Sequence, residues 1–292
     1  MKFTLFVLML FLLSPVQAAA EAKAKEELNL AYVKNGHPLQ KLDLYLPAAG
    51  KPLNPLVIWI HGGAWEGGSK TKCPAKFLVA QGYVVASLDY RLSQTALFPA
   101  QIQDCKAAVR WLRAHAQDYQ IDPKRIGVWG GSAGGHLAAL LGTTKQLKAF
   151  DVGGHLDQSS EVQCVVDWFG PTDFLRYGSP QKFDPQDPKN AAAKLFGGPV
   201  SSKLELAKMA SPIYYVQAAQ TAPFLIVHGD QDELVPLQQS ESFFQALRAA
   251  KIDSSLTVIP GANHGGPIFY QEASLTLVAD FFRHHLQAEA KR

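Results

Sequence analysis

Short apolar runs recur along most of the chain, separated by amphipathic or small-residue stretches. A continuous apolar run of about four to eight residues is typical of a strand that is buried on both faces. We interpret as such strands residues 55–60, 83–88, 125–129, 162–169, 223–228 and 255–259. Between or after them, helices are expected at residues 75–80, 99–119, 133–142, 237–250 and 272–286. This alternation predicts a mainly parallel sheet covered by helices on both faces.

The first part of the globular sequence has a different pattern. Residues 27–33 and 39–46 are two strand-like runs separated by Asn35-Gly36, which is typical of an antiparallel hairpin. Together with the buried strands, the hairpin predicts an α/β fold with an open, mostly parallel sheet of about eight strands.

Residues 175–217 interrupt the alternation. This stretch contains five prolines and the pair Gly197-Gly198, and it is too long for an ordinary connection. We expect an irregular insertion or small cap with one or two short helices, at a place where active-site lids often occur. A surface insertion without a role is the alternative.

The N-terminus has the pattern of an export signal. Lys2 is followed by an apolar stretch at residues 3–13 and by Val16-Gln17-Ala18, which resembles a cleavage site. We therefore expect a signal peptide at residues 1–18 and a secreted or periplasmic mature protein, residues 19–292, that forms a single domain. The apolar stretch is shorter than the roughly 20 residues that cross a bilayer, so we expect no membrane span in the mature chain. An uncleaved anchor is the alternative.

Charge and cysteine content limit the classes of function that the sequence favours. The formal net charge is +3, and acidic and basic residues are mixed along the chain, which gives no indication of nucleic-acid binding. Cys73, Cys105 and Cys164 would allow one disulfide and leave one thiol, and the sequence does not choose among the pairings. Because no cysteine has a partner at metal-ligand spacing, we expect no metal, and nothing indicates a cofactor.

The candidate chemistry begins at Gly130-Gly131-Ser132-Ala133-Gly134. This G-x-S-x-G segment lies between a predicted strand and a predicted helix, which is the context of a nucleophile elbow, where a serine sits on a sharp turn. A serine hydroxyl needs a base to remove its proton, and the base needs a carboxylate to orient it. Ser132 therefore predicts a histidine and an acid elsewhere in the chain.

Two later turns supply these groups in the order that the elbow requires. The strand at 223–228 ends in a polar turn with Asp230, Asp232 and Glu233, of which Asp232 is favoured as the acid. The strand at 255–259 is followed by His264 in a glycine-rich loop, and His264 is favoured as the base. Both turns lie at the carboxyl ends of parallel strands, the same edge as Ser132. Asp167, at the end of another strand, is a more distant candidate for the acid.

Attack on an ester produces an oxyanion, which requires preorganised hydrogen-bond donors. The segment after the first central strand begins His61-Gly62-Gly63, and its glycines allow backbone N–H groups to face a ligand. We expect an oxyanion hole made of the N–H groups of Gly63, Ala64 and Ala133. A simple turn is the alternative for a Gly-Gly pair alone.

With these motifs, the chain resembles α/β-hydrolase-fold carboxylesterases of the hormone-sensitive-lipase-like group, especially the feruloyl- and acetyl-esterase-like branch. The matching segments are HGGAW at 61–65, DYRLS at 89–93, the run at 98–113, GGSAGGH at 130–136, WFGPTD at 168–173, HGDQDELVP at 228–236 and GANHG at 261–265. The resemblance implies the triad Ser132, Asp232 and His264 and the oxyanion hole given above. Members of the family often have a third glycine where this chain has Ala64, and that departure counts against esters of tertiary alcohols.

The resemblance also suggests where a substrate would lie. It implies structural roles for Asp89, Arg91, Asp173 and His136. Walls of an acyl or alcohol pocket are expected at Trp65, Leu92, Phe98, Trp168 and Phe169, although the same residues could belong to the core.

The sequence therefore predicts a secreted serine hydrolase that cleaves small acyl, hydroxycinnamoyl or acetyl esters through an acyl-enzyme. Its expected partner is a small-molecule or polysaccharide-linked ester. The alternatives are a peptidase of the prolyl-oligopeptidase type, a lipase, and a non-catalytic binding protein on a hydrolase fold. The short N-terminal segment argues against the peptidase, because such peptidases carry a large N-terminal propeller.

Overall fold

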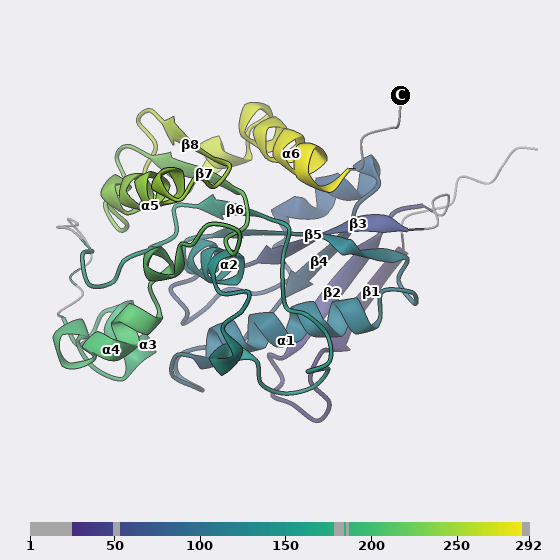
Figure 1. Cartoon of the computed structure of the whole chain (residues 1–292), viewed down its shortest axis with the longest axis horizontal. Helices are drawn as coiled ribbons and strands as arrows, with labels where there is room; N and C mark the ends of the chain where they lie inside the picture. The colour runs from purple at the N-terminus through teal and green to yellow at the C-terminus, as the bar shows by residue number, and fades with distance from the viewer. Residues whose placement is uncertain (1–24, 49–52, 178–183, 185–186, 288–292) are drawn as a thin grey trace, which may run out of the picture.

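The structure is a computed structural model that describes residues 25–48, 53–177, 184 and 187–287. The expected signal peptide, residues 1–18, lies outside the described residues. One eight-stranded sheet runs through the molecule, as Figure 1 shows. Its strand order is β1 (Lys25–Ala31), β2 (Lys41–Leu46), β4 (Val84–Leu88), β3 (Asn54–Ile60), β5 (Ile121–Gly131), β6 (Cys164–Trp168), β7 (Phe224–Gly229) and β8 (Ser254–Ile259).

The sheet is antiparallel at one edge and parallel elsewhere. Strand β2 pairs antiparallel with both β1 and β4. All pairs from β4 and β3 to β7 and β8 are parallel. The expected hairpin and the expected mostly parallel sheet of about eight strands are both confirmed.

The continuous apolar runs are explained by burial of the sheet on both faces. Along β3, Leu56, Ile58 and Ile60 join one hydrophobic cluster, whereas Val57 and Trp59 join the cluster on the opposite face. Because side chains alternate between the faces of a strand, a strand covered on both sides must be apolar at every position.

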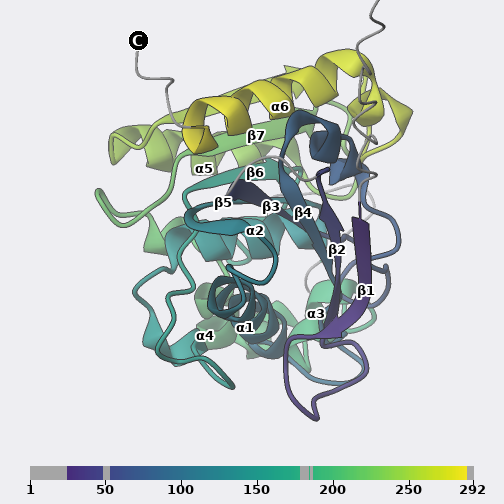
Figure 2. The ribbon, with the colours of Figure 1, turned by 90° about the vertical axis from the view of Figure 1, so that its right-hand side faces the viewer.

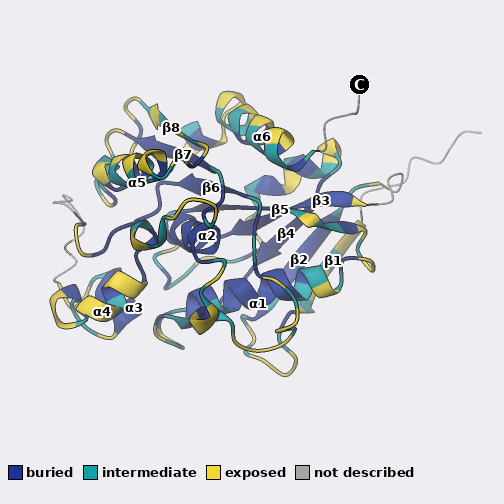
Figure 3. Cartoon of the chain, in the orientation of Figure 1, coloured by how far each residue is buried: buried dark blue, intermediate teal, exposed yellow. Residues whose placement is uncertain are grey.

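Helices form the two outer layers. Helices α1 (Ala100–Ala114), α2 (Ala133–Thr143) and α5 (Leu237–Ala249) contribute to one cluster, and α6 (Glu272–Leu286) and the 3-10 helix η1 (Pro74–Gln81) contribute to the other. Figure 2 shows α6 on one side of the sheet and α1 and α2 on the other. Figure 3 shows the central strands and α2 as the most continuously buried part of the molecule.

Two expected helices differ in detail. The segment predicted as a helix at 75–80 is the 3-10 helix η1. The helix predicted at 99–119 ends at Ala114. The chain continues as turns to Gln120, whose φ of 54° redirects it into β5.

The insertion at 175–217 contains short elements, in line with the sequence pattern. These are α3 (Ala191–Phe196), η3 (Val200–Ser202), α4 (Leu204–Met209) and η4 (Pro212–Tyr215). Leu195 and Phe196 are buried in the cluster that also contains α1 and α2, and the backbone N–H of Phe98 donates to the carbonyl of Leu195. The insertion is therefore anchored to the main body, next to the segment that leads into α1.

The described cysteines are all free. Cys105 lies buried in α1 and Cys164 lies buried in β6. Every helix within the described residues is too short or too polar to serve as a membrane span.

Candidate active site

Ser132 lies on a strained turn between β5 and α2. Its φ is 57° and its ψ is −122°, a combination that side-chain-bearing residues rarely adopt. The turn requires glycine on both sides. A Cβ on Gly130 would lie 2.1 Å from the carbonyl oxygen of Gly134, and a Cβ on Gly134 would lie 2.1 Å from that of Ile60. The motif thus has the backbone geometry that presents a nucleophile.

The structure brings Ser132, His264 and Asp232 together. The Ser132 Oγ lies 2.7 Å from the His264 Nε2, and the His264 Nδ1 lies 2.7 Å from the Asp232 Oδ2. The imidazole is therefore held between a hydroxyl that it can deprotonate and a carboxylate that orients it. Phe169 packs edge-on against the His264 ring, with 4.8 Å between ring centroids.

The carboxylate of Asp232 is fully buried and strongly hydrogen-bonded. Its Oδ1 accepts from the backbone N–H groups of Leu234 and Val235, at 2.9 and 2.8 Å. Burial alone would raise the pKa of Asp232, but hydrogen bonds from His228 and His264 and the adjacent backbone N–H of Val235 hold that pKa well below its ordinary range. Asp232 is therefore a carboxylate throughout the range in which a histidine can act as a base.

His228 is a member of this network that the sequence did not identify. It is completely buried, and its Nε2 lies 3.2 Å from the Asp232 Oδ2 and 2.9 Å from the carbonyl oxygen of Val235. Its Nδ1 lies 2.6 Å from the Ser240 Oγ. Because both neighbours of Nε2 are acceptors, we assign the proton to Nε2 and have Ser240 donate to Nδ1. The sequence contained one signal, a histidine at the end of a fully apolar strand.

The other carboxylates considered for the acid make different contacts from those of Asp232. Asp230 accepts a hydrogen bond from the backbone N–H of Gly261, at 2.6 Å, and so holds the loop that carries His264. Asp167 is buried beneath α2 and accepts from the backbone N–H of Gly170, at 3.0 Å. Glu233 lies in the turn that carries Asp232, and its backbone N–H donates to the Oδ1 of Asn263.

The candidate oxyanion hole lies beside Ser132. A Cβ on Gly62 would lie 3.3 Å from the Cβ of Ser132, so the loop after β3 passes directly over the nucleophile. Within the described residues, no acceptor pairs with the backbone N–H groups of Gly63 and Ala64. Ala133 is the first residue of α2, and its N–H has no acceptor within the helix. The loop that carries Gly63 and Ala64 and the first residue of α2 thus both lie next to Ser132, and the oxyanion hole stays a prediction.

Trp65 anchors this loop rather than lining an open surface. It is 3 % exposed, and its indole N–H donates to the Nδ1 of His136, at 3.2 Å. The Nε2 of His136 lies 2.6 Å from the carbonyl oxygen of Ala210, so this nitrogen donates to the insertion. Burial lowers the pKa of His136 to about 4, although the bond to Ala210 opposes that effect, and the ring is therefore neutral at ordinary pH.

The remaining residues expected around the substrate are mostly internal. Phe98 and Trp168 are buried in the two hydrophobic clusters, and Leu92 packs against the first of them. Phe169 is the one that contacts the proposed base.

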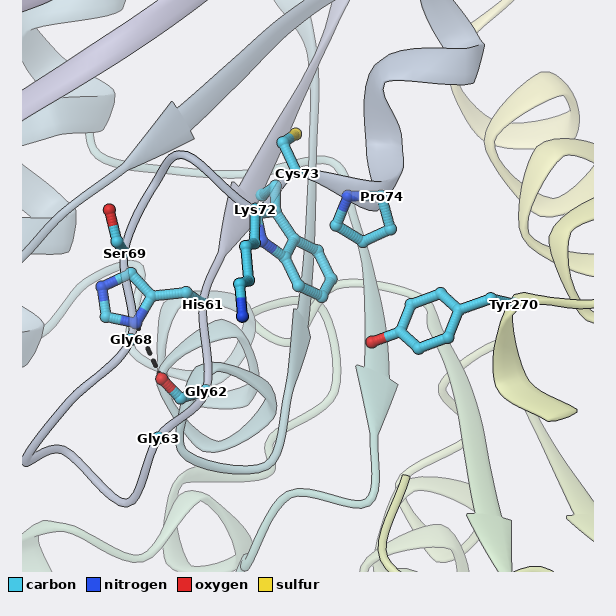
Figure 4. Close-up of a pocket in the computed structure, with 10 residues that line it drawn as sticks. His61, Gly62, Gly63, Gly68, Ser69, Lys72, Cys73, Pro74 and Tyr270 are labelled. Carbon is cyan, nitrogen blue, oxygen red and sulfur yellow. Dashed lines mark hydrogen bonds between the residues drawn. The ribbon is translucent and has the colours of Figure 1, made fainter. Parts of the chain in front are cut away.

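A cavity of about 590 Å³ opens beside the candidate oxyanion hole (Figure 4). None of the five residues expected as pocket walls lines it. Its walls come from the end of β3, the loop that follows, the start of η1 and the 3-10 helix η5 (Pro267–Tyr270). The residues that line it include Trp59, Gly62, Gly63, Lys72, Pro74 and Tyr270.

Comparison with known proteins identifies the family. The BD-FAE family model matches residues 42–247, which is most of the chain. The chain belongs to the BD-FAE family. Its eight-stranded sheet is that of the α/β-hydrolase fold, and the resemblance inferred from the motifs is confirmed.

Among proteins similar to this BD-FAE chain, esterases recur. The esterase LipC of Mycobacterium tuberculosis is 33 % identical over 236 residues, covering 78 % of this chain and 57 % of its own length. A solved structure of a truncated carbohydrate esterase from gut microbiota is 32 % identical with a TM-score of 0.85, and the match covers 92 % of this chain and 99 % of that one. A bifunctional GH43-CE protein of Bacteroides eggerthii is 34 % identical with a TM-score of 0.81, covering 89 % of this chain and 38 % of that one. The chain spans about half the length of the first curated relatives that it matches.

Proposed function

We propose that this protein is a serine hydrolase that cleaves carboxylic esters through an acyl-enzyme. The observation that carries the proposal is the continuous relay from Ser132 through His264 to Asp232, with 2.7 Å at each step. The proposal is also supported by Gly62, which lies next to Ser132, and by the N–H groups of Gly63 and Ala64, for which no acceptor is found within the described residues. The names of the similar proteins, which include esterases and carboxylesterases, support the same reaction.

The geometry suggests how each step would proceed. His264 Nε2 accepts the proton of Ser132 as its Oγ attacks the ester carbonyl, and Asp232 stabilises the imidazolium that forms. The oxyanion would lie against the N–H groups of Gly63, Ala64 and Ala133. His264 then donates its proton to the leaving alcohol, and a water molecule, activated by the same imidazole, releases the acyl group from Ser132.

The proposed substrates are esters of small acyl or hydroxycinnamoyl groups, including acetyl groups on saccharides. The structural similarity to a protein named as a carbohydrate esterase supports a sugar-linked alcohol.

We also propose that residues 1–18 form a signal peptide and that the mature protein acts outside the cytoplasm. Mass spectrometry of exported protein would reveal a new N-terminus near Ala19 if this is correct, and an intact Met1 if it is wrong.

Replacement of the nucleophile provides the decisive test. Ser132→Ala should reduce kcat for p-nitrophenyl acetate on the order of a million-fold, because the triad acts as one unit. A fluorophosphonate should label the unmodified protein at Ser132 and leave Ser132→Ala unlabelled. Undiminished turnover by the variant would refute the assignment, and a preference for dipeptidyl anilides over esters would indicate a peptidase instead.

A further inference from the structure

The cavity beside Gly63 carries a positive charge at its wall. Figure 4 shows the side chains of Lys72 and Tyr270 pointing from two different elements toward the same space near Gly62. Burial raises the pKa of Tyr270, so its hydroxyl remains a hydrogen-bond donor at neutral pH. The Tyr270 ring is held edge-on against Trp168, with 5.5 Å between ring centroids. The cavity therefore presents an ammonium group and a positioned phenol.

Lys72 differs from its lysine neighbours in having no partner among the residues that the structure describes. Lys70 pairs with Asp43 at 2.8 Å, and Lys76 lies 3.8 Å from Glu26 and 3.9 Å from the Tyr45 ring centroid. The Lys72 ammonium group makes no ion pair or hydrogen bond within the described part of the chain. Lys72 is exposed, and no residue that lines the cavity is acidic, so the positive charge at the cavity wall is available to an anionic group of a ligand.

The position of the cavity connects this charge to the chemistry. Gly62 and Gly63 form part of its wall, and a Cβ on Gly62 would lie 3.3 Å from the Cβ of Ser132. An ester held by Ser132 would therefore extend one of its two portions into the cavity. Trp59 and Pro74 supply apolar walls along which a short carbon chain could pack.

We propose that this cavity is a carboxylate subsite, and that the enzyme prefers esters bearing a carboxylate on the portion that enters it. Lys72 is the specificity-determining residue, and the Tyr270 hydroxyl is the second donor. A charge-assisted hydrogen bond from an ammonium group to a carboxylate favours such a ligand over a neutral one of the same shape. The inference rests on the proposed ester hydrolysis and names its substrate class.

The carboxylate could belong to the acyl portion or to the alcohol portion, and two pairs of substrates distinguish these sources. The acyl pair is monomethyl glutarate and the methyl ester of glutaramic acid, which replaces the carboxylate by an amide. The alcohol pair is 3-acetoxypropanoate and 3-acetoxypropanamide. Within one pair, kcat/KM for the anionic ester should exceed that for the neutral ester by about tenfold, mainly through a lower KM.

Variants then assign the preference to the cavity. Lys72→Met should abolish the preference by raising KM for the anionic ester of the pair, and Lys72→Glu should reverse it. Lys76→Met is the matched control and should retain it. The inference is overturned if neither pair shows a preference, or if Lys72→Met keeps it. Failure of the proposed function is a different result, in which the unmodified protein hydrolyses none of the four esters faster than Ser132→Ala.

Discussion

Four donors surround the carboxylate of Asp232, two backbone N–H groups on one oxygen and two imidazoles on the other. A carboxylate bonded on both oxygens cannot rotate freely, and its direction fixes the tilt of the His264 ring. His228 contributes one of these bonds from a completely buried position. In the proposed reaction His228 is thus a positioning residue, since it contacts the acid and not the substrate.

Replacing His228 should slow the chemical step. His228→Leu removes the N–H that faces Asp232, and we expect kcat for p-nitrophenyl acetate to fall about 10- to 100-fold with little change in KM, the effect of losing one hydrogen bond to a charged group. The control is Ser240→Ala, which removes the contact on the other side of the same ring and should preserve most of kcat. Circular dichroism would verify that both variants are folded, and an unchanged kcat in folded His228→Leu would mean that the ring merely fills space.

The residues of the site differ in how far the sequence could predict them. The elbow motif indicates Ser132 by local geometry, and the glycine-rich loop after the last strand indicates His264. Asp230 and Asp232 lie in one turn, so spacing favours Asp232 without excluding its neighbour. Which of them reaches the imidazole depends on how the turn folds back onto β7. The contact between His228 and Asp232 depends on the same fold-back, and no periodicity reveals it.

At the scale of elements, helix α2 is fitted closely against the ends of the strands beneath it. A Cβ on Gly134 would lie 2.1 Å from the carbonyl oxygen of Ile60, and a Cβ on Gly135 would lie 2.3 Å from the Oδ1 of Asp167. These glycines set the distance between α2 and the sheet, and therefore the height of Ser132 above it. The elbow depends on this packing as much as on its own backbone angles.

Gly134→Ala should displace α2 and impair both stability and catalysis. The added methyl group meets backbone, which cannot move aside, so we expect the free energy of unfolding to fall by about 2 kcal/mol. A displacement of Ser132 by about 1 Å would reduce kcat by about 100-fold. Urea unfolding and ester hydrolysis measure the two effects. Gly154→Ala is the control, because a Cβ there meets nothing within 4 Å. Equal behaviour of the two variants would contradict this account of the packing.

Elements were predictable where one periodic signal dominates. The apolar runs indicate the buried strands because burial on both faces leaves no polar positions, as β3 illustrates. Residues 75–80 are apolar enough for a helix, but the segment is short and begins at a proline, and it forms the tighter 3-10 helix η1. The order of the strands in the sheet is not encoded by periodicity, because any buried strand can neighbour another.

Two buried titratable groups, His136 and Asp167, lie where α2 packs against β6. Their protonation affects the stability of the whole molecule. Burial lowers the pKa of His136 from 6.5 to about 4. Burial raises the pKa of Asp167 from 3.8 to about 6, although the N–H of Gly170 and the nearby His228 oppose the rise. The Oδ2 of Asp167 has no hydrogen-bond partner among the described residues.

These two shifts act in opposite directions on stability. Between about pH 4 and 6.5 the unfolded chain binds more protons at His136 than the folded chain does, so this group makes stability rise with pH. Between about pH 3.8 and 6 the folded chain binds more protons at Asp167, so this group makes stability fall as pH rises. Each shift corresponds to about 3 kcal/mol, and in the unmodified protein they nearly cancel.

In Asp167→Asn, the contribution of His136 to the pH dependence of stability should no longer be offset by Asp167. The amide oxygen of asparagine can still accept the N–H of Gly170, but the variant carries no charge to desolvate. Its free energy of unfolding should equal that of the unmodified protein near pH 4 and exceed it by about 3 kcal/mol at pH 7. Urea unfolding at several pH values measures the difference, and other titrating groups cancel because both proteins share them. Asp118→Asn, at an exposed position, should show no such trend. The difference in free energy of unfolding between Asp167→Asn and the unmodified protein could instead stay constant from pH 4 to 7. That result would mean that Asp167 is not protonated in the folded protein. Its burial would then have to be compensated by a group other than His228 and Gly170.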